Sequence, residues 1–390
     1  MAKRAKRVKR VRSSTNFSPN WESLSHDLVH SILEKLVYFP DYIRFSAVCK
    51  SWNSIASYHK RKHTKLNDHQ LPWLLTSSKV NEQLIKFRLY NHTSTAANKI
   101  SNFQLQIPQT EVFQELCLGS SHGWLFFLEN LDSLLAINPL FGTIIRFPPF
   151  ESSFVKAQKF VLSGDPYLGS NFEVIVVASA GARNGTVVAH LKYGNEFWTY
   201  SERFSSFYNF NFTFYKNRIL GATCFGQILS VNVSSDDTSR RFEIKAINGD
   251  VDFECASVSY LVETTKNDLL MVLRCNICKC LPQVCVKYKV YKLVELNGEL
   301  ECVLVSNLDG HCLFLGKCQP ISVLASNYPG CNEDSIYYSY ADFNDNGVEE
   351  FSLEDQSVRE KRNVDTLYRP LWILPSFMND QVSWGKKIMM

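Results

Sequence analysis

Three short stretches of the sequence hold the side chains whose types and spacing could do chemistry. Residues 119–123, GSSHG, match the G-x-S-x-G pattern, in which the central serine, here Ser121, attacks a carbonyl carbon. Residues 342–347, DFNDNG, match the start of a calcium-binding loop, whose carboxylate and amide oxygens bind the ion. A Cys-x-x-Cys spacing can hold zinc, and it occurs within a cluster formed by Cys275, Cys278, Cys280 and Cys285.

The elements expected around these stretches argue against all three chemistries. A nucleophilic serine needs a strand-to-helix turn, but the following WLFFLEN has strand character, so a turn that delivers Trp124 into a core is favoured. In the calcium loop the bidentate glutamate position falls on Leu353, and flanking strand patterns favour an Asn-Gly hairpin turn. The cysteines fall at a hairpin turn without a histidine nearby. We expect no catalytic residue, no cofactor and no metal, with calcium and zinc as the alternatives.

The composition is that of a globular protein in a reducing compartment. Of the 390 residues 45% are hydrophobic and 21% charged, and no apolar run approaches the roughly 18 residues of a membrane span. Twelve cysteines without a secretory signal indicate free thiols rather than a disulfide framework. We therefore expect no membrane partner.

Basic charge is concentrated at the start of the chain. The first twelve positions hold no acid and seven basic residues, namely Lys3, Arg4, Lys6, Arg7, Lys9, Arg10 and Arg12. Without them the net charge of +4 becomes −3, so the rest of the chain is not expected to bind nucleic acid. Such a run is typical of a nuclear-localisation segment or of a solvated, disordered end. The expected location is the nucleus, with the cytoplasm as an additional one.

Most of the chain has the pattern of an all-β domain. From residue 63 to 377, apolar runs of about five to eight residues alternate with turn segments such as NPLFG, SGDP, NYPG and NDNG. Three hundred residues of this kind exceed one sandwich and suit a β-propeller of six or seven blades. We expect a disordered basic tail over residues 1–20, a helical module over 21–62, the propeller over 63–377 and a C-terminal tail over 378–390.

The helical module has apolar residues on two faces of its first helix. Leu28, Ile32 and Leu36 form one line at a spacing of four, and Val29, Leu33 and Val37 form a second line beside it. A helix that covers a single core needs only one such stripe. We expect a helix that starts at Ser23 or Ser25, runs to about Tyr38, and uses one stripe for the core and the other for a partner.

The module also resembles an F-box. The similarity lies in residues 24–28 (LSHDL), 32–33 (IL), 36, 44–45 (RF) and 48–52 (VCKSW). The resemblance implies three short helices that dock onto a Skp-type adaptor and, through it, onto a cullin ubiquitin ligase. The residues assigned to adaptor binding are Leu24, Ser25, Leu28, Ile32, Leu33 and Leu36. The sequence departs from the family at Ser25, where a proline is usual.

The β-rich part is similar to the C-terminal domain of a family of plant F-box proteins, a domain described as a β-propeller. The similarity is carried by residues 119–125, 138–139, 146–149, 260–263, 268–272, 314–316, 335–338 and 371–375. The resemblance spans about residues 20–377 and implies α+β multidomain architecture, with a small three-helix F-box followed by an all-β propeller. It implies a non-catalytic ligase subunit whose propeller recruits an unidentified protein substrate.

Two other functions are consistent with the residues alone. The chain could be a nuclear protein-interaction module outside any ligase, which adaptor binding would distinguish. It could also be an enzyme on a propeller scaffold, since a fold does not fix a function. The enzyme hypothesis predicts several carboxylates or a metal that converge at the centre of the propeller.

Overall fold

A computed structural model of the chain divides into two compact units, Met1–His63 and Thr64–Met390, each described by itself. The residues that the structure describes are 21, 24–36, 44–62, 71–81, 84–91, 99–101, 117–129, 133–139, 142–150, 156–169, 171–179, 185–204, 211–233, 241–247, 256–277, 285–296, 299–328, 330–341, 346–366 and 368–375. Within these residues no helix is long and apolar enough to cross a bilayer.

In the described part of the first unit, the helices α1 (His26–Glu34) and α3 (Lys50–Lys62) pack against each other. Ser25 occupies the N-cap position of α1, and Asp27 places a negative charge in its first turn, where the helix dipole favours it. The buried apolar side chains of the unit form its small core, namely Val29, Leu33, Phe45, Trp52, Ile55 and Ala56. The rings of Phe45 and Trp52 lie 4.6 Å apart.

Helix α1 is shorter than the sequence pattern predicts. It ends at Glu34 rather than near Tyr38, because the N–H groups of Lys35 and Leu36 donate to the carbonyl oxygens of Ile32 and Leu33, three residues back. Bonds of this kind tighten the last turn of a helix and terminate it. Val37 and Tyr38 lie outside the described residues.

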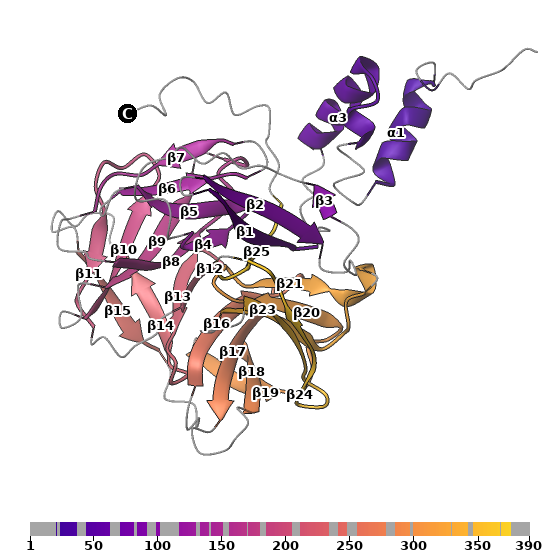
Figure 1. Cartoon of the computed structure of the whole chain (residues 1–390). Helices are drawn as coiled ribbons and strands as arrows, with labels where there is room; N and C mark the ends of the chain where they lie inside the picture. Colours follow the sequence, from indigo (N-terminus) through magenta and orange to yellow (C-terminus); the bar gives the residue numbers. More distant parts are fainter. Residues whose placement is uncertain are drawn as a thin grey trace, which may run out of the picture. The chain divides into compact units, whose positions relative to one another are not determined.

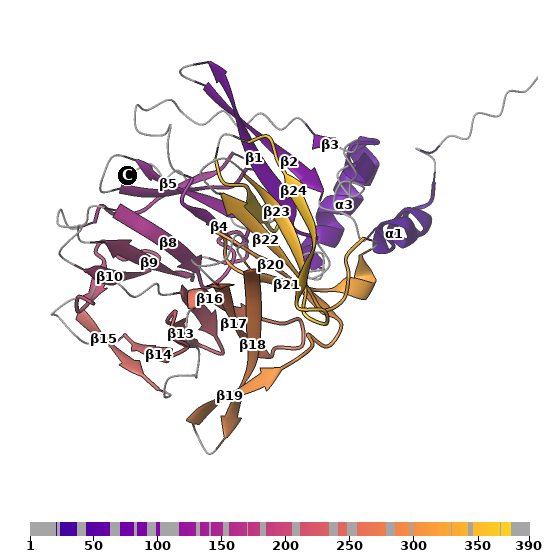
Figure 2. The same ribbon diagram turned by 60° about the horizontal axis from the view of Figure 1, so that its bottom comes forward.

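The second unit is built from largely antiparallel strands in four-, five- and eight-stranded sheets (Figures 1 and 2). The bounds of its first fifteen strands are β1 Trp73–Asn81, β2 Leu84–Asn91, β3 Lys99–Ser101, β4 Gly119–Ser121, β5 Trp124–Glu129, β6 Ser133–Ile137, β7 Ile144–Arg146, β8 Lys156–Leu162, β9 Glu173–Ser179, β10 Thr186–Lys192, β11 Thr199–Ser201, β12 Asn211–Tyr215, β13 Arg218–Ala222, β14 Ile228–Asn232 and β15 Arg241–Ala246. The others are β16 Ala256–Glu263, β17 Leu269–Ile277, β18 Cys285–Leu296, β19 Glu299–Val305, β20 His311–Leu315, β21 Ile321–Leu324, β22 Ser335–Ala341, β23 Asn346–Ser352, β24 Ser357–Asn363 and β25 Leu371–Ile373.

These strands form six blades within the described residues, in agreement with the predicted propeller. In chain order the blades are β25-β1-β2-β3 (blade 1), β4 to β7 (blade 2), β8 to β11 (blade 3), β12 to β15 (blade 4), β16 to β19 (blade 5) and β21-β20-β22-β23-β24 (blade 6). Blades 3 and 4 are continuous, because the outer strands β11 and β15 pair in parallel. Blade 6 is irregular, since its strands β20 and β22 also run parallel.

Each blade has an innermost strand, called its first strand below. The first strands of successive blades lie next to one another and surround the centre of the domain. The contacts run from β25 to β4, β8, β12, β16 and β21 in turn. The ring is closed by the end of the chain, because β25 pairs with β1 from Trp73↔Ile373 to Leu75↔Leu371. Blade 1 therefore combines strands from both ends of the domain (Figure 1).

Apolar cores lie between neighbouring blades and take up most of the large aromatic side chains. Trp124 from blade 2 and Trp198 from blade 3 share one core, and Phe314 from blade 6 and Trp372 from blade 1 share another. Trp124 and Trp372 are completely buried. Many of the aromatic side chains that the structure describes therefore help to join the blades.

Candidate functional site

The two apolar stripes of helix α1 have opposite environments. Val29 and Leu33 are 1% exposed and belong to the core of the first unit. Leu28 and Ile32, on the neighbouring line, are 55% and 36% exposed. The predicted division into an inner and an outer stripe is confirmed for these four residues. Leu28 and Ile32 are called the outer stripe below.

The other residues assigned to adaptor binding have mixed environments. Leu24 and Leu36 are half-buried, and Ser25 is exposed and makes no side-chain cap hydrogen bond. Leu33 departs from its assignment, because it packs inside the unit and leaves no surface for a partner. Sequence reasoning missed three exposed large hydrophobic side chains of this unit, Trp21, Val48 and Tyr58. The seven basic residues of the tail lie outside the described residues.

The GSSHG stretch forms a hairpin that joins blades, as its strand context predicts. Strand β4 turns at His122 and Gly123 into β5, which buries Trp124. The Ser121 hydroxyl donates to Gln319 Oε1 and accepts from the Leu162 N–H at 3.0 Å. Because these bonds tie blade 2 to blades 3 and 6, Ser121 has a structural place in the fold.

The other two candidate stretches are described only in part. Strands β22 and β23 pair up to Ala341↔Asn346, so the expected hairpin is present, but residues 342–345 lie outside the described residues. Strands β17 and β18 likewise pair up to Ile277↔Cys285, with residues 278–284 outside the description. Within the described residues, no three His, Cys, Asp or Glu side chains come together as metal ligands would.

A central cavity of about 750 Å³ lies inside the ring of first strands. Its described lining includes Ser120 and Ser121 of β4, Leu162 of β8, Thr213 and Phe214 of β12, Leu261 and Glu263 of β16, Ile321 to Leu324 of β21, and Leu374 after β25. Hydroxyl and apolar side chains dominate this lining, and Glu263 is its only described carboxylate. Several converging carboxylates, which the enzyme hypothesis predicts, are not found among the described lining residues.

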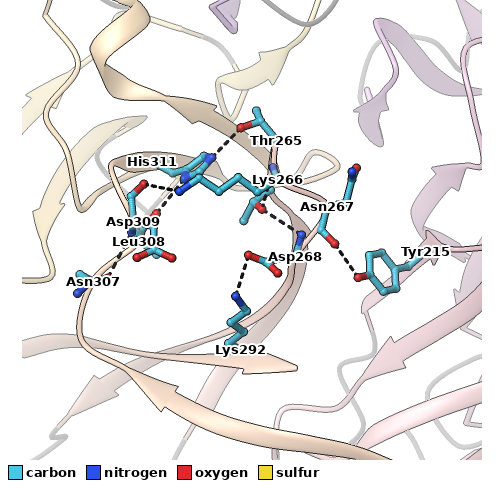
Figure 3. A network of polar contacts seen from close by, with 11 residues as sticks. Tyr215, Thr265, Lys266, Asn267, Asp268, Lys292, Asn307, Leu308, Asp309 and His311 are labelled. Carbon is cyan, nitrogen blue, oxygen red and sulfur yellow. Dashed lines mark hydrogen bonds and ion pairs between the residues drawn. The ribbon is translucent and has the colours of Figure 1, made fainter. Parts of the chain in front are cut away.

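A polar network holds the rim of the central cavity beside blades 4, 5 and 6 (Figure 3). The Tyr215 hydroxyl donates to the Asn267 carbonyl at 2.7 Å, which ties β12 to the turn between β16 and β17. The Thr265 hydroxyl lies 2.7 Å from His311 Nε2, and Lys292 Nζ lies 2.8 Å from the Asp268 carboxylate. Since His311 Nδ1 lies 2.9 Å from the Leu308 carbonyl, the ring is hydrogen-bonded on both sides. The network fixes the backbone of this turn.

A second and larger hollow, the side groove, runs between blades 3 and 4. It has a volume of about 1630 Å³. Its walls are the ends of β9 and β10, the loop of residues 193–198, the turn between β12 and β13, and the end of β14. The exposed Phe197 and the exposed basic residues Lys192, Lys216 and Arg218 line it.

Three charged side chains that line the side groove contact other described residues. Glu173 lies 2.9 Å from His190 Nε2, and this hydrogen bond lowers the pKa of the Glu173 carboxyl. Arg218 forms an exposed ion pair of 3.7 Å with Glu295. Lys216 Nζ lies 4.8 Å from the ring centre of Tyr215, a cation–π contact.

Both units match families of known proteins. The profile described as KIB1-4 beta-propeller matches residues 87–366, and the F-box domain profile matches residues 21–64. The putative F-box protein At4g17565 of Arabidopsis thaliana is 27% identical over 122 residues, which cover 31% of this chain and 30% of that protein. The putative F-box protein At2g33200 of the same plant is 25% identical over 140 residues, which cover 36% and 32% of the two chains. The alignments thus span about a third of these relatives.

Solved structures show only distant likeness. A chain from a study of two prolyl endopeptidases has a TM-score of 0.36 and 11% identity, over 76% of this chain and 42% of that one. The GH93 alpha-L-arabinofuranosidase of Fusarium graminearum has a TM-score of 0.35 and 8% identity, over 75% and 81%. At these scores the likeness carries no argument about activity.

Proposed function

Because the chain belongs to the KIB1-4 β-propeller family and begins with an F-box domain, we propose that it is the substrate-receptor subunit of a Skp–cullin–F-box ubiquitin ligase. The F-box would bind the Skp-type adaptor and, through it, the cullin. The propeller would bind the target protein.

One observation in particular supports the proposal that the F-box binds the adaptor. The outer stripe, Leu28 and Ile32, is exposed to solvent on a helix whose neighbouring stripe already fills the core of its unit. Exposed apolar side chains of this kind mark surfaces that bind partners. An amphipathic surface on a helix suits a partner that packs another helix against it. Trp21 and Val48 add exposed apolar area in the same unit.

In this role the chain contributes no reacting group. It would raise the effective concentration of a target lysine near a ubiquitin-loaded enzyme, which is catalysis by proximity. The central cavity, with Glu263 as its only described carboxylate, accords with a binding role.

The test measures adaptor binding by the full chain. We would titrate a Skp-type adaptor into the parent, into Leu28→Asp/Ile32→Asp, and into Leu304→Asp, which changes an exposed apolar residue of the propeller. The proposal expects tight binding by the parent and by Leu304→Asp, and a loss of at least about 100-fold in the double variant, because two charges would be buried at the interface. Circular dichroism checks that every variant is folded.

Absence of binding by the parent would contradict the ligase role. It would favour a protein-interaction module outside a ligase, and Ser25 in place of the usual proline would then be the first residue to revert. A double variant that binds like the parent would instead show that the adaptor uses another surface.

The basic segment of residues 3–12 supports a nuclear location as part of this proposal. We expect a fluorescent fusion of the full chain to accumulate in the nucleus and a fusion with all seven basic residues changed to glutamine to lose that accumulation. If the two fusions have the same distribution in the cell, the proposed role of the basic segment in nuclear location is wrong.

A further inference from the structure

The side groove and the central cavity share part of their lining. Ser163, Phe214 and Glu263 line both of them, so the two hollows meet where strands β12 and β16 end. This meeting point, defined by Ser163, Phe214 and Glu263, is called the junction below. The side groove alone exceeds the roughly 300–1,000 Å³ that small-molecule sites occupy, so a segment of protein chain suits it better than a small ligand.

The basic residues that line the side groove already interact with other groups of the protein. Lys216 lies over the Tyr215 ring, and Arg218 pairs with Glu295. Lys192 lies near enough to Glu173 to lower the pKa of that carboxyl, together with His190. An incoming acidic segment would therefore have to compete with partners that the protein already supplies.

Glu263 differs from these residues. Among the described residues it has no ion pair within 4 Å, although Lys216 lies close enough to act on its charge at longer range. Glu263 is an exposed residue, but partial desolvation of its carboxyl raises the pKa of that group, and Lys216 opposes the shift. A partly desolvated carboxylate without a contact partner is stabilised by a cation that comes within hydrogen-bond distance.

An aromatic side chain that lines the same junction as Glu263 narrows the choice of cation. Phe214 stands one residue before the end of β12, is half-buried, and lines the junction with Glu263. A guanidinium group can stack on an aromatic face while it pairs in bidentate fashion with a carboxylate, whereas an ammonium group is a compact, strongly hydrated charge. Phe214 and Glu263 together therefore favour arginine over lysine as the bound cation.

We propose that the side groove binds an extended segment of the recruited target protein and that an arginine of this segment enters the junction, where it pairs with Glu263 and stacks on Phe214. The inference rests on the proposed function, because it names the chemistry of the target segment. The outer part of the groove, with the exposed Phe197, would contact the residues that flank the arginine.

The test uses the full chain and seven-residue peptides, Ala-Ser-Ala-Xaa-Ala-Ser-Ala, in ligand-observed NMR titrations. Xaa is arginine, its neutral isostere citrulline, lysine or glutamate. We expect the arginine peptide to bind at least tenfold more tightly than the citrulline peptide and several-fold more tightly than the lysine peptide. Glu263→Gln should abolish the preference for arginine over citrulline. The matched control Glu301→Gln, an exposed change on β19, should retain it.

Equal binding of the arginine and citrulline peptides, or no binding of either, would overturn the proposal. So would a preference for arginine that persists in Glu263→Gln. Tightest binding by the glutamate peptide would overturn it in favour of an acidic segment held by Lys192, Lys216 and Arg218. Since these titrations contain no adaptor, the result is independent of the adaptor measurement, and failure of one can be told from failure of the other.

Discussion

The guanidinium of Arg274 and the carboxylate of Glu349 form an ion pair of 3.1 Å that joins blades 5 and 6. Both side chains are buried, with exposed fractions of 10% and 7%. Arg274 Nε also donates to the Tyr288 hydroxyl at 3.0 Å, and its guanidinium carbon lies 4.2 Å from the centre of the Tyr338 ring. The environment of Arg274 raises the pKa of its guanidinium, since the neighbouring side chains outweigh the cost of burial.

Removal of one partner of this ion pair should lower the stability of the protein more than removal of both partners. Glu349→Leu leaves a buried guanidinium without its carboxylate, and we expect it to lower the free energy of unfolding by about 3–5 kcal/mol. Arg274→Met combined with Glu349→Leu leaves no buried charge and should cost clearly less. Urea denaturation of the two variants measures the difference. A double variant as unstable as the single one would contradict this account.

A methyl group at Gly119 should disturb the hairpin that joins blade 2 to blade 6. A Cβ atom built there would lie 2.7 Å from the Lys317 carbonyl oxygen, which is backbone and cannot move aside freely. We expect Gly119→Ala to destabilise the propeller by about 1–3 kcal/mol, as overpacking usually does. Gly164→Ala is the matched control, because nothing lies within 4 Å of its Cβ position. Thermal unfolding of both variants decides, and equal melting temperatures would refute the steric argument.

Closure of the propeller should depend on Trp372. Its ring is fully buried, lies 4.9 Å from that of Phe314, and its carbonyl accepts a hydrogen bond from the Ser120 hydroxyl. We expect Trp372→Ala to cost about 3–5 kcal/mol. Phe225→Ala, at a position that is 49% exposed, should stay within about 0.5 kcal/mol of the parent. Chemical denaturation provides the values, and a small effect at Trp372 would show that β25 contributes little.

Lys159 predicts a pH dependence of stability above neutrality. Burial lowers the pKa of its amine to about 7, although Cys224 opposes the shift. In the unfolded chain the amine titrates near its usual value of about 10.4. Between these two pKa values the unfolded state binds more protons than the folded state. The free-energy cost of removing the proton from Lys159 on folding therefore falls as pH increases from about 7 to 10, and the stability of the folded protein rises.

The variant Lys159→Met should lack that dependence. We expect the parent to gain stability relative to Lys159→Met by on the order of 1 kcal/mol between pH 7 and pH 9.5, a figure that allows for solvent screening at a half-buried site. Denaturation curves of both proteins at the two pH values give the comparison. A difference that is constant with pH would mean that the amine is charged in the folded state.

Local patterns predicted the elements better than their long-range partners. The spacing of Val29 and Leu33 against Leu28 and Ile32 sufficed to predict a helix with two apolar stripes, because a helical period is a local property. The end of α1 was predicted too late, since the closing bonds of Lys35 and Leu36 are set by local geometry that the apolar period does not report. The hairpin at residues 119–124 could be predicted because the strand pattern and turn residues are adjacent in the sequence.

The blade count and the junction could not be obtained in the same way. No repeat with a fixed period marks the blades, and blade 6 departs from the others through its parallel pair β20 and β22. Phe214 and Glu263 stand at strand ends 49 positions apart, and only the ring of first strands brings them to one place. Their place in one lining is a property of the propeller, and no local sequence pattern indicates it.

The pairing of β25 with β1 also sets an order of events during synthesis. About 310 residues separate the end of α3 from the end of β25, and at roughly 5–20 residues per second a ribosome needs about 15–60 s to add them. The F-box helices can fold during that interval, whereas β1 cannot pair with β25 until β25 has been synthesised. The nascent chain would thus present its apolar F-box stripe well before the propeller is complete, at the stage when chaperones bind exposed apolar surface. If the proposed adaptor binds at this stage, it would shield that stripe while the remaining blades are made.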